Sequence, residues 1–187
     1  ASEVVRLTNK ARLEKGIAPL QYSQKLSDLA FLRAKRSSEP GDGEKFPGLV
    51  EIWWTSTSIL GSTHKAVETV VNSMLYVSGS RSDMLNTENT HIGVGLYRTN
   101  DGRIYWILLF SDFNPEQTYT VTLDPAGGVC DMNGIDYFIV PYNGIIYQED
   151  LPTPKLDGYT FNKWTYNNSI FSHMVVNGDI TLKAIWK

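Results

Sequence analysis

Apolar residues recur at helical spacing in the first part of the chain. Val4, Leu7 and Ala11 lie three or four positions apart and predict a helix that Gly16 ends. Ser23 is a good N-cap residue and predicts the start of a second helix. The apolar positions of this helix are Leu26, Leu29 and Ala30, and Pro40-Gly41 lies just beyond its end.

A third helix is predicted after residues 62–63 and is expected to end at Gly79. Its apolar stripe has the offsets 0, 3, 4, 7 and 8 of a helix that faces a core. The stripe consists of Val67, Val70, Val71, Met74 and Leu75. Two strands follow, at residues 92–97 and 104–110, joined by a turn at 100–102. The second strand has no polar alternation, which predicts burial on both faces, with helices on both sides of a short antiparallel sheet.

Beyond residue 117 the pattern changes to short strands separated by Gly, Pro and Asn. Strands are predicted at residues 119–123, 137–140, 159–164 and 180–186. Most aromatic residues at these positions are expected to be buried, because a unit this small needs them for its core. They include Tyr159, Phe161, Trp164 and Trp186.

The charge balance changes near Asn114-Pro115. Residues 1–113 hold 13 basic and 12 acidic residues, whereas residues 114–187 hold 4 and 8. We therefore predict one domain at 1–113, a linker at 114–117 and a second domain at 118–187. The whole chain of 187 residues has a net charge of −3, which argues against a nucleic-acid partner. It has no apolar run long enough for a transmembrane segment.

Common catalytic and metal motifs are absent from the sequence. Cys130 is the one cysteine, and the three histidines, His64, His91 and His173, lie far apart. No nucleophile elbow, phosphate-binding loop or zinc-binding helix motif is present. The chain opens with Ala-Ser-Glu and carries no signal peptide, so we expect that a removed export signal or a cloning boundary precedes it.

Several motifs of the first 113 residues resemble the CAP superfamily, which comprises cysteine-rich secretory proteins, antigen 5 and pathogenesis-related-1 proteins. The motifs are Asn9-x-x-Arg12, Gly16-x-x-Pro19-Leu20, the segment 77–86, His91-Ile-Gly-Val-Gly95, and Tyr105-Trp106 with Phe110. The resemblance implies an α+β fold whose first domain is a three-layer α-β-α sandwich.

Residues 118–187 resemble the Listeria–Bacteroides repeat of internalin-B-type surface proteins. The matching segments are 119–128, 151–164 and 178–186. This resemblance implies a small β-grasp-like, non-catalytic module. Both resemblances together imply a secreted or surface protein of a Gram-positive bacterium, extracellular or associated with the cell wall.

The CAP resemblance also implies a cleft with two histidines and two acids, which holds a divalent cation in some members. Here Ser80 stands where the second histidine is expected, and Glu39 replaces the first. Glu51 keeps the family's carboxylate, and Leu108 stands where a glutamine is expected. We therefore expect no metal and no cofactor.

Glu51 and His64 are the candidate residues for chemistry in this cleft. Glu51 is interpreted either as a cleft acid or lone ligand, or as a carboxylate that is hydrogen-bonded to backbone amides. His64 either replaces a lost cleft histidine or lies exposed at the start of a helix. Trp53 and Trp54 are adjacent, so in a strand at most one of them can face the core. The other is expected to line a ligand cleft or to contact the second domain.

Two functions remain open at this level. The favoured one is a non-catalytic binding module for a glycan, lipid or protein, with the second domain as a spacer. The alternative is a peptidase-like hydrolase that uses Glu51 and His64 as an acid/base pair. The first is favoured because no complete catalytic set is evident in the sequence.

Overall fold

The computed structural model describes residues 1–38, 46, 48–57, 64–130 and 136–187, with only the backbone of residues 64 and 65. It divides into two compact units, residues 1–40 with 49–116 and residues 41–48 with 117–187. Mixed helix and strand content confirms the α+β class. The predicted boundaries at residues 113 and 118 stay a prediction.

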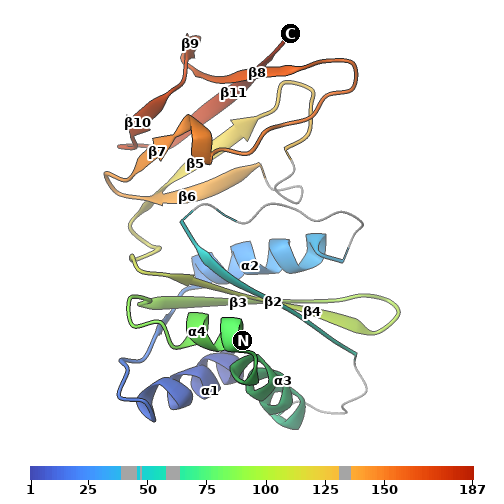
Figure 1. Ribbon diagram of the computed structural model, residues 1–187, viewed down its shortest axis with the longest axis vertical. Helices are drawn as coiled ribbons and strands as arrows, with labels where there is room; N and C mark the ends of the chain where they lie inside the picture. The colour runs from blue at the N-terminus through green and yellow to red at the C-terminus, as the bar shows by residue number, and fades with distance from the viewer. Residues whose placement is uncertain (39–45, 47, 58–63, 131–135) are drawn as a thin grey trace. The chain divides into compact units, whose positions relative to one another are not determined.

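The first unit is a four-stranded sheet between helices. Its elements in chain order are α1 (Ser2–Leu13), β1 (Gln21–Tyr22), α2 (Gln24–Arg36), β2 (Val50–Thr57), α3 (His64–Tyr76), α4 (Ser78–Met84), β3 (His91–Arg98) and β4 (Arg103–Ser111). The strand order is β1-β3-β4-β2; β1 is parallel to β3 and the other pairs are antiparallel. Helix α2 covers one face of the sheet, and α1, α3 and α4 cover the other (Figure 1).

Burial follows the predicted pattern in most of this unit. Residues 105–111 of β4 are all buried, as expected for a strand covered on both faces. Val70, Val71 and Met74 of the α3 stripe lie in the core, with Val67 and Leu75 partly buried around it. Ser23 caps α2 by accepting a hydrogen bond from the backbone N–H of Leu26.

The prediction that Gly79 ends the third helix is wrong. Helix α3 ends at Tyr76, because Val77 has an extended backbone (φ −75°, ψ 124°) that breaks the helical hydrogen bonds. Gly79 lies inside the separate helix α4, which the sequence pattern did not predict. Seven residues are too few to show a helical period.

Two glycines let α2 lie directly on β3. A Cβ atom at Gly93 would come within 2.3 Å of the Leu26 backbone, and one at Gly95 within 2.1 Å of the Ala30 backbone. No side chain can occupy that space. In the same place the Ser27 hydroxyl accepts a hydrogen bond of 3.0 Å from the Val94 N–H. The Gly-Val-Gly motif therefore sets the spacing between helix and sheet.

Arg12 joins α1 to the segment between α4 and β3. Its side chain is fully buried, and its guanidinium donates to the carbonyls of Ala18, Met84, Asn86 and Asn89 at 2.8–3.1 Å. Burial lowers the pKa of Arg12 from its ordinary value. These four backbone acceptors satisfy the buried guanidinium and hold this corner of the fold together.

Asn9 fixes the chain that leaves the first helix. Its side-chain amide donates to the Leu20 carbonyl at 2.9 Å and accepts from the Leu20 N–H at 2.7 Å. Gly16 has a φ of 72°, which allows the sharp exit from α1. Both polar residues of the Asn9-x-x-Arg12 motif therefore have a structural role.

The second unit is built from short strands. They are β5 (Thr118–Asp124), β6 (Tyr137–Pro141), β7 (Ile145–Tyr147), β8 (Phe161–Tyr166), β9 (Ser169–Ile170), β10 (His173–Val175) and β11 (Ile180–Trp186), with a 3₁₀ helix at Gln148–Asp150. One sheet has the order β6-β5-β11-β8-β9, and β7 pairs with β10 in a second sheet. Strands β5 and β11 are parallel.

Trp164 is the largest fully buried side chain of this unit, and its indole N–H donates to the Pro152 carbonyl at 3.0 Å. Phe161 and Trp186 pack edge-on at 5.8 Å and are partly buried. Tyr159 is 62% exposed and is an exception to the expectation that most of these aromatics are buried. It precedes β8, which begins at Phe161, so the alternation of the strand does not apply to it.

Candidate functional site

Glu51 is paired with Arg33. The Glu51 carboxylate on β2 accepts two hydrogen bonds from the Arg33 guanidinium on α2, at 2.9 Å from Nε and 3.0 Å from Nη2. The two side chains are 2% and 10% exposed. Both carboxylate oxygens therefore face a fixed cation in a buried place, the geometry of a strong bidentate pair.

Neither sequence-based interpretation of Glu51 describes this arrangement. The partner is a guanidinium rather than backbone amides, and the carboxylate is not open to a cleft. Arg33 was missed, although a signal for it existed. It follows Leu26, Leu29 and Ala30 at the next core-facing position of α2, and a cation on an apolar helix face needs a buried partner.

The two tryptophans of β2 face opposite sides of the sheet. Trp53 lies on the α2 side, as Glu51 does, and is 49% exposed, with its ring edge-on to Tyr105 at 6.3 Å. Trp54 lies on the other side, where it packs half-buried against the core. The prediction that at most one of them is core is consistent with this alternation.

Trp54 contributes to an open groove against α3. The groove has a volume of about 550 Å³ and is lined by Trp54, Thr69, Asn72, Ser73, Tyr76 and Val77. Thr69, Asn72, Ser73 and Tyr76 have the offsets 0, 3, 4 and 7, so they lie on one face of the helix. Tyr76 is 86% exposed. The groove was not predicted, because its α3 residues carry no catalytic motif.

Ser80 lies half-buried in α4. A second hollow, of about 640 Å³, lies beside this helix and is lined by Ser78, Arg81, Ser82, Leu85, Asn86 and Thr87. Ser80 is not among its lining residues. Glu39 lies outside the described residues, and only the backbone of His64 is described, as the first residue of α3.

The predicted cleft residues thus do not share one surface in the described part of the chain. Glu51 and Trp53 lie on the α2 side of β2, while Trp54 lies on the α3 side. Among the described residues no group of three or more His, Cys, Asp or Glu side chains is placed to hold a metal ion.

His91 lies at the start of β3, half-buried. Burial lowers its pKa, while the nearby Glu116 carboxylate and the Phe113 backbone act in the opposite direction. Its Nδ1 lies 2.9 Å from the Thr90 hydroxyl. His91 thus lies at the start of an inner strand, where it is paired with Gln21 of β1 and Ser111 of β4.

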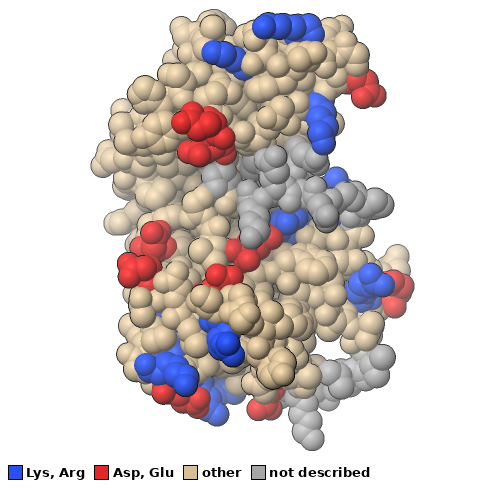
Figure 2. Space-filling model, viewed as in Figure 1, with Lys and Arg blue, Asp and Glu red and all other residues tan. Residues whose placement is uncertain are grey.

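Figure 2 shows acidic and basic side chains scattered over the visible face, with the described cations forming no continuous basic patch there. Within the described ranges, no helix is both long and apolar enough to cross a membrane.

Comparison with known proteins assigns the family. The model of the cysteine-rich secretory protein family, CAP, matches residues 5–110, more than half of the chain. The chain therefore belongs to the CAP family. A search of curated protein sequences finds no match.

Similar solved structures include proteins from three bacteria. An extracellular protein with an SCP domain from Bacillus anthracis is 17% identical with a TM-score of 0.45; 59% of this chain and 39% of that one are covered. An outer surface protein from Borrelia burgdorferi is 16% identical with a TM-score of 0.45, covering 57% and 87%. A cysteine-rich secretory protein from Staphylococcus aureus is 17% identical with a TM-score of 0.38, covering 57% and 36%. The chain thus spans about two fifths of the Bacillus anthracis protein.

Proposed function

We propose that this chain is an extracellular, non-catalytic binding module of a Gram-positive bacterium, with a degenerate CAP domain that carries the ligand site. The Arg33–Glu51 ion pair is the observation that carries the proposal. A general acid or base must exchange a proton with a substrate at hydrogen-bond distance. Both oxygens of Glu51 are instead held by Arg33 in a buried pair.

The proposed location outside the cell rests on the family. The family is named for cysteine-rich secretory proteins. The resemblance of residues 118–187 to the Listeria–Bacteroides repeat, a module of surface proteins, supports the same location and association with the cell wall. We assign this β-grasp-like module the role of a spacer, because its large aromatics Trp164, Phe161 and Trp186 are used in packing.

The alternative hydrolase has less support. It needs Glu51 to act with His64, and Glu51 already neutralises a buried cation. Releasing that carboxylate would leave Arg33 buried without its partner, which costs several kcal/mol. A binding role needs no such rearrangement.

A ligand screen with a matched hydrolase assay tests the proposal. The intact chain is applied to arrays of cell-wall glycans and host glycans, to sterol-containing vesicles and to fluorogenic peptide substrates. We expect binding to one ligand class and no turnover. Peptide hydrolysis that Glu51→Gln abolishes, while circular dichroism shows an unchanged fold, would establish the hydrolase instead.

A further inference from the structure

We propose that the groove between α3 and Trp54 binds a neutral saccharide. This inference deepens the proposed function, because it assigns the site and the ligand class of the binding module. It rests on three properties of the six lining residues: an exposed aromatic ring, amide and hydroxyl groups beside it, and the lack of charge.

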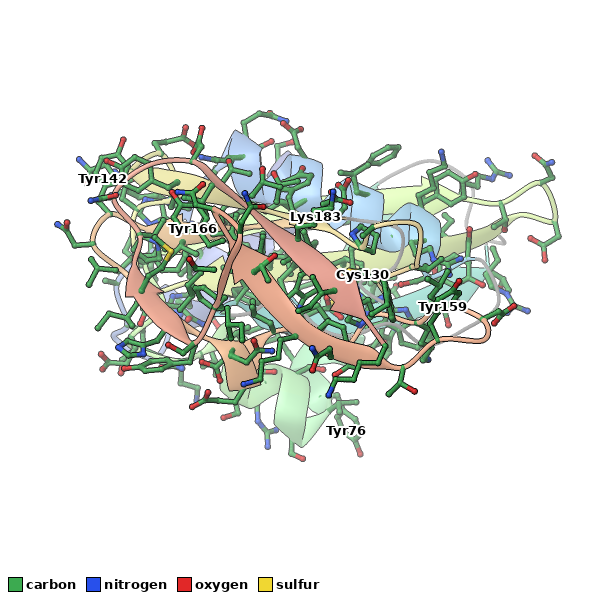
Figure 3. All side chains as sticks on the ribbon, turned by 90° about the horizontal axis from the view of Figure 1, so that it is seen from above. Tyr76, Cys130, Tyr142, Tyr159, Tyr166 and Lys183 are labelled. Atoms are coloured by element: carbon green, nitrogen blue, oxygen red, sulfur yellow. The ribbon has the colours of Figure 1, made fainter. Side chains whose placement is uncertain are left out.

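The aromatic surface comes from two residues on different elements. Tyr76, at the end of α3, is 86% exposed, and Figure 3 shows it standing clear of the ribbon. Trp54 on β2 is half-buried and lines the same groove. Leaving a large aromatic ring in water forfeits its burial energy. The C–H face of a pyranose ring can recover that energy by stacking on such a ring.

The polar groups of the groove suit sugar hydroxyls. Asn72 lies one helical turn before Tyr76 and lines the groove at an exposed position. An amide offers both donors and an acceptor, as a sugar hydroxyl requires. The Ser73 hydroxyl donates to the Thr69 carbonyl at 2.8 Å, and its oxygen can still accept. An aromatic face beside groups that both donate and accept hydrogen bonds suits a pyranose ring, which has an apolar C–H face and hydroxyl groups at its edge.

The charge of the groove selects against other ligands. The described lining residues Trp54, Thr69, Asn72, Ser73, Tyr76 and Val77 include no Asp, Glu, Lys, Arg or His. A phosphate or carboxylate ligand would be desolvated there without a cation, and a basic peptide without an anion. The neighbouring hollow on α4 differs in this respect, since it contains Arg81. The volume of about 550 Å³ falls within the usual range of small-ligand sites.

The test compares neutral and charged oligosaccharides on matched variants of the intact chain. Chitotetraose, cellotetraose and maltotetraose are titrated by calorimetry, with fully deacetylated chitotetraose as the cationic counterpart of the same backbone. Tyr76→Ala and Asn72→Ala alter the groove at exposed positions. Tyr159→Ala removes another exposed tyrosine, in the second unit, and serves as the control.

We expect at least one neutral tetrasaccharide to bind, with affinity reduced about tenfold or more by Tyr76→Ala and about fivefold by Asn72→Ala. Tyr159→Ala should leave the affinity unchanged, and deacetylation should weaken binding. Absence of binding by all neutral tetrasaccharides overturns the inference, as does binding that Tyr76→Ala leaves intact. Vesicle binding without saccharide binding would overturn the inference while sustaining the proposed function. Glu51-dependent peptide hydrolysis would overturn the function separately.

Discussion

The guanidinium of Arg33 and the carboxylate of Glu51 form a bidentate ion pair between α2 and β2, with both side chains at most 10% exposed. The pair joins the helix on one face of the sheet to an edge strand of that sheet. A buried pair of this kind makes each residue depend on the other, because removing one leaves the other as an isolated charge.

Glu51→Ala should therefore destabilise the CAP domain by about 3–5 kcal/mol. The double variant Arg33→Met/Glu51→Leu should recover most of this loss, since it removes both charges and keeps side-chain volume. Urea denaturation, followed by circular dichroism, measures the free energy of unfolding of the single and the double variant. Glu14→Ala breaks an exposed pair with Lys10 at 3.9 Å and should leave the midpoint nearly unchanged. Equal midpoints for Glu51→Ala and Glu14→Ala would show that the pair contributes no stability.

Zinc should not bind tightly to this chain. The carboxylate of Glu51 is already neutralised, and Ser80 offers a neutral hydroxyl where the family resemblance implies an imidazole. Calorimetry with zinc at neutral pH measures the affinity. Stoichiometric binding below the micromolar range, lost in Glu51→Gln, would mean that the ion pair opens to form a metal site.

The close contact of α2 with β3 predicts opposite effects for two Gly→Ala substitutions. Gly93→Ala places a Cβ 2.3 Å from the Leu26 backbone and should cost about 3 kcal/mol or more, because neither backbone can move away alone. Gly79 in α4 has nothing within 4 Å of the added carbon. Gly79→Ala should be neutral or stabilise by up to about 1 kcal/mol. Thermal melting measures the stability of the two variants. A Gly93→Ala variant as stable as the parent chain would disprove the close contact between α2 and β3.

Trp164 should control the stability of the second unit. It is fully buried and its indole N–H is satisfied by the Pro152 carbonyl, so Trp164→Ala should cost about 3–5 kcal/mol. The exposed Tyr159 provides the control, and Tyr159→Ala should change stability by less than about 0.5 kcal/mol. Hydrogen exchange of the backbone amides in the second unit measures the change in stability for both variants. Loss of ligand binding by Trp164→Ala without loss of stability would replace the spacer role with a recognition role.

Separate fragments test the domain boundary. Residues 1–116 should melt cooperatively, because this fragment contains the whole first sheet and the helices on both of its faces. Residues 117–187 should also fold, with lower stability because a unit of this size buries less of its surface. Scanning calorimetry of each fragment provides the measurement. If neither fragment melts cooperatively, the two units share a core and the boundary is misplaced.

The glycine-rich β3 shows how far local pattern reaches. The sequence predicted strands at residues 92–97 and 104–110 joined by a turn at 100–102, and the structure places both strands within one residue of these bounds. The reason that Gly93 and Gly95 must be glycines lies in α2, about 65 residues away in sequence. No local pattern encodes such a contact.

Tyr76 and Gly79 show where pattern alone failed. The extended backbone at Val77 separates α3 from the short helix α4, although valine is not a helix-breaking residue of the Gly or Pro type. The groove formed by Tyr76, Asn72 and Trp54 combines residues of α3 and β2, so no pattern within one element could predict it.

The sequence by itself determined the α+β class, the CAP family motifs, the hairpin and the apolar stripe of α3, because these depend on residue spacing within one element. The tertiary structure alone decided that Glu51 is an ion-paired residue and that Trp53 and Trp54 serve different faces. It also decided that Tyr76 borders an uncharged groove. Each of these facts depends on which distant side chain completes a charge or covers a ring, and that partner is chosen by packing in three dimensions.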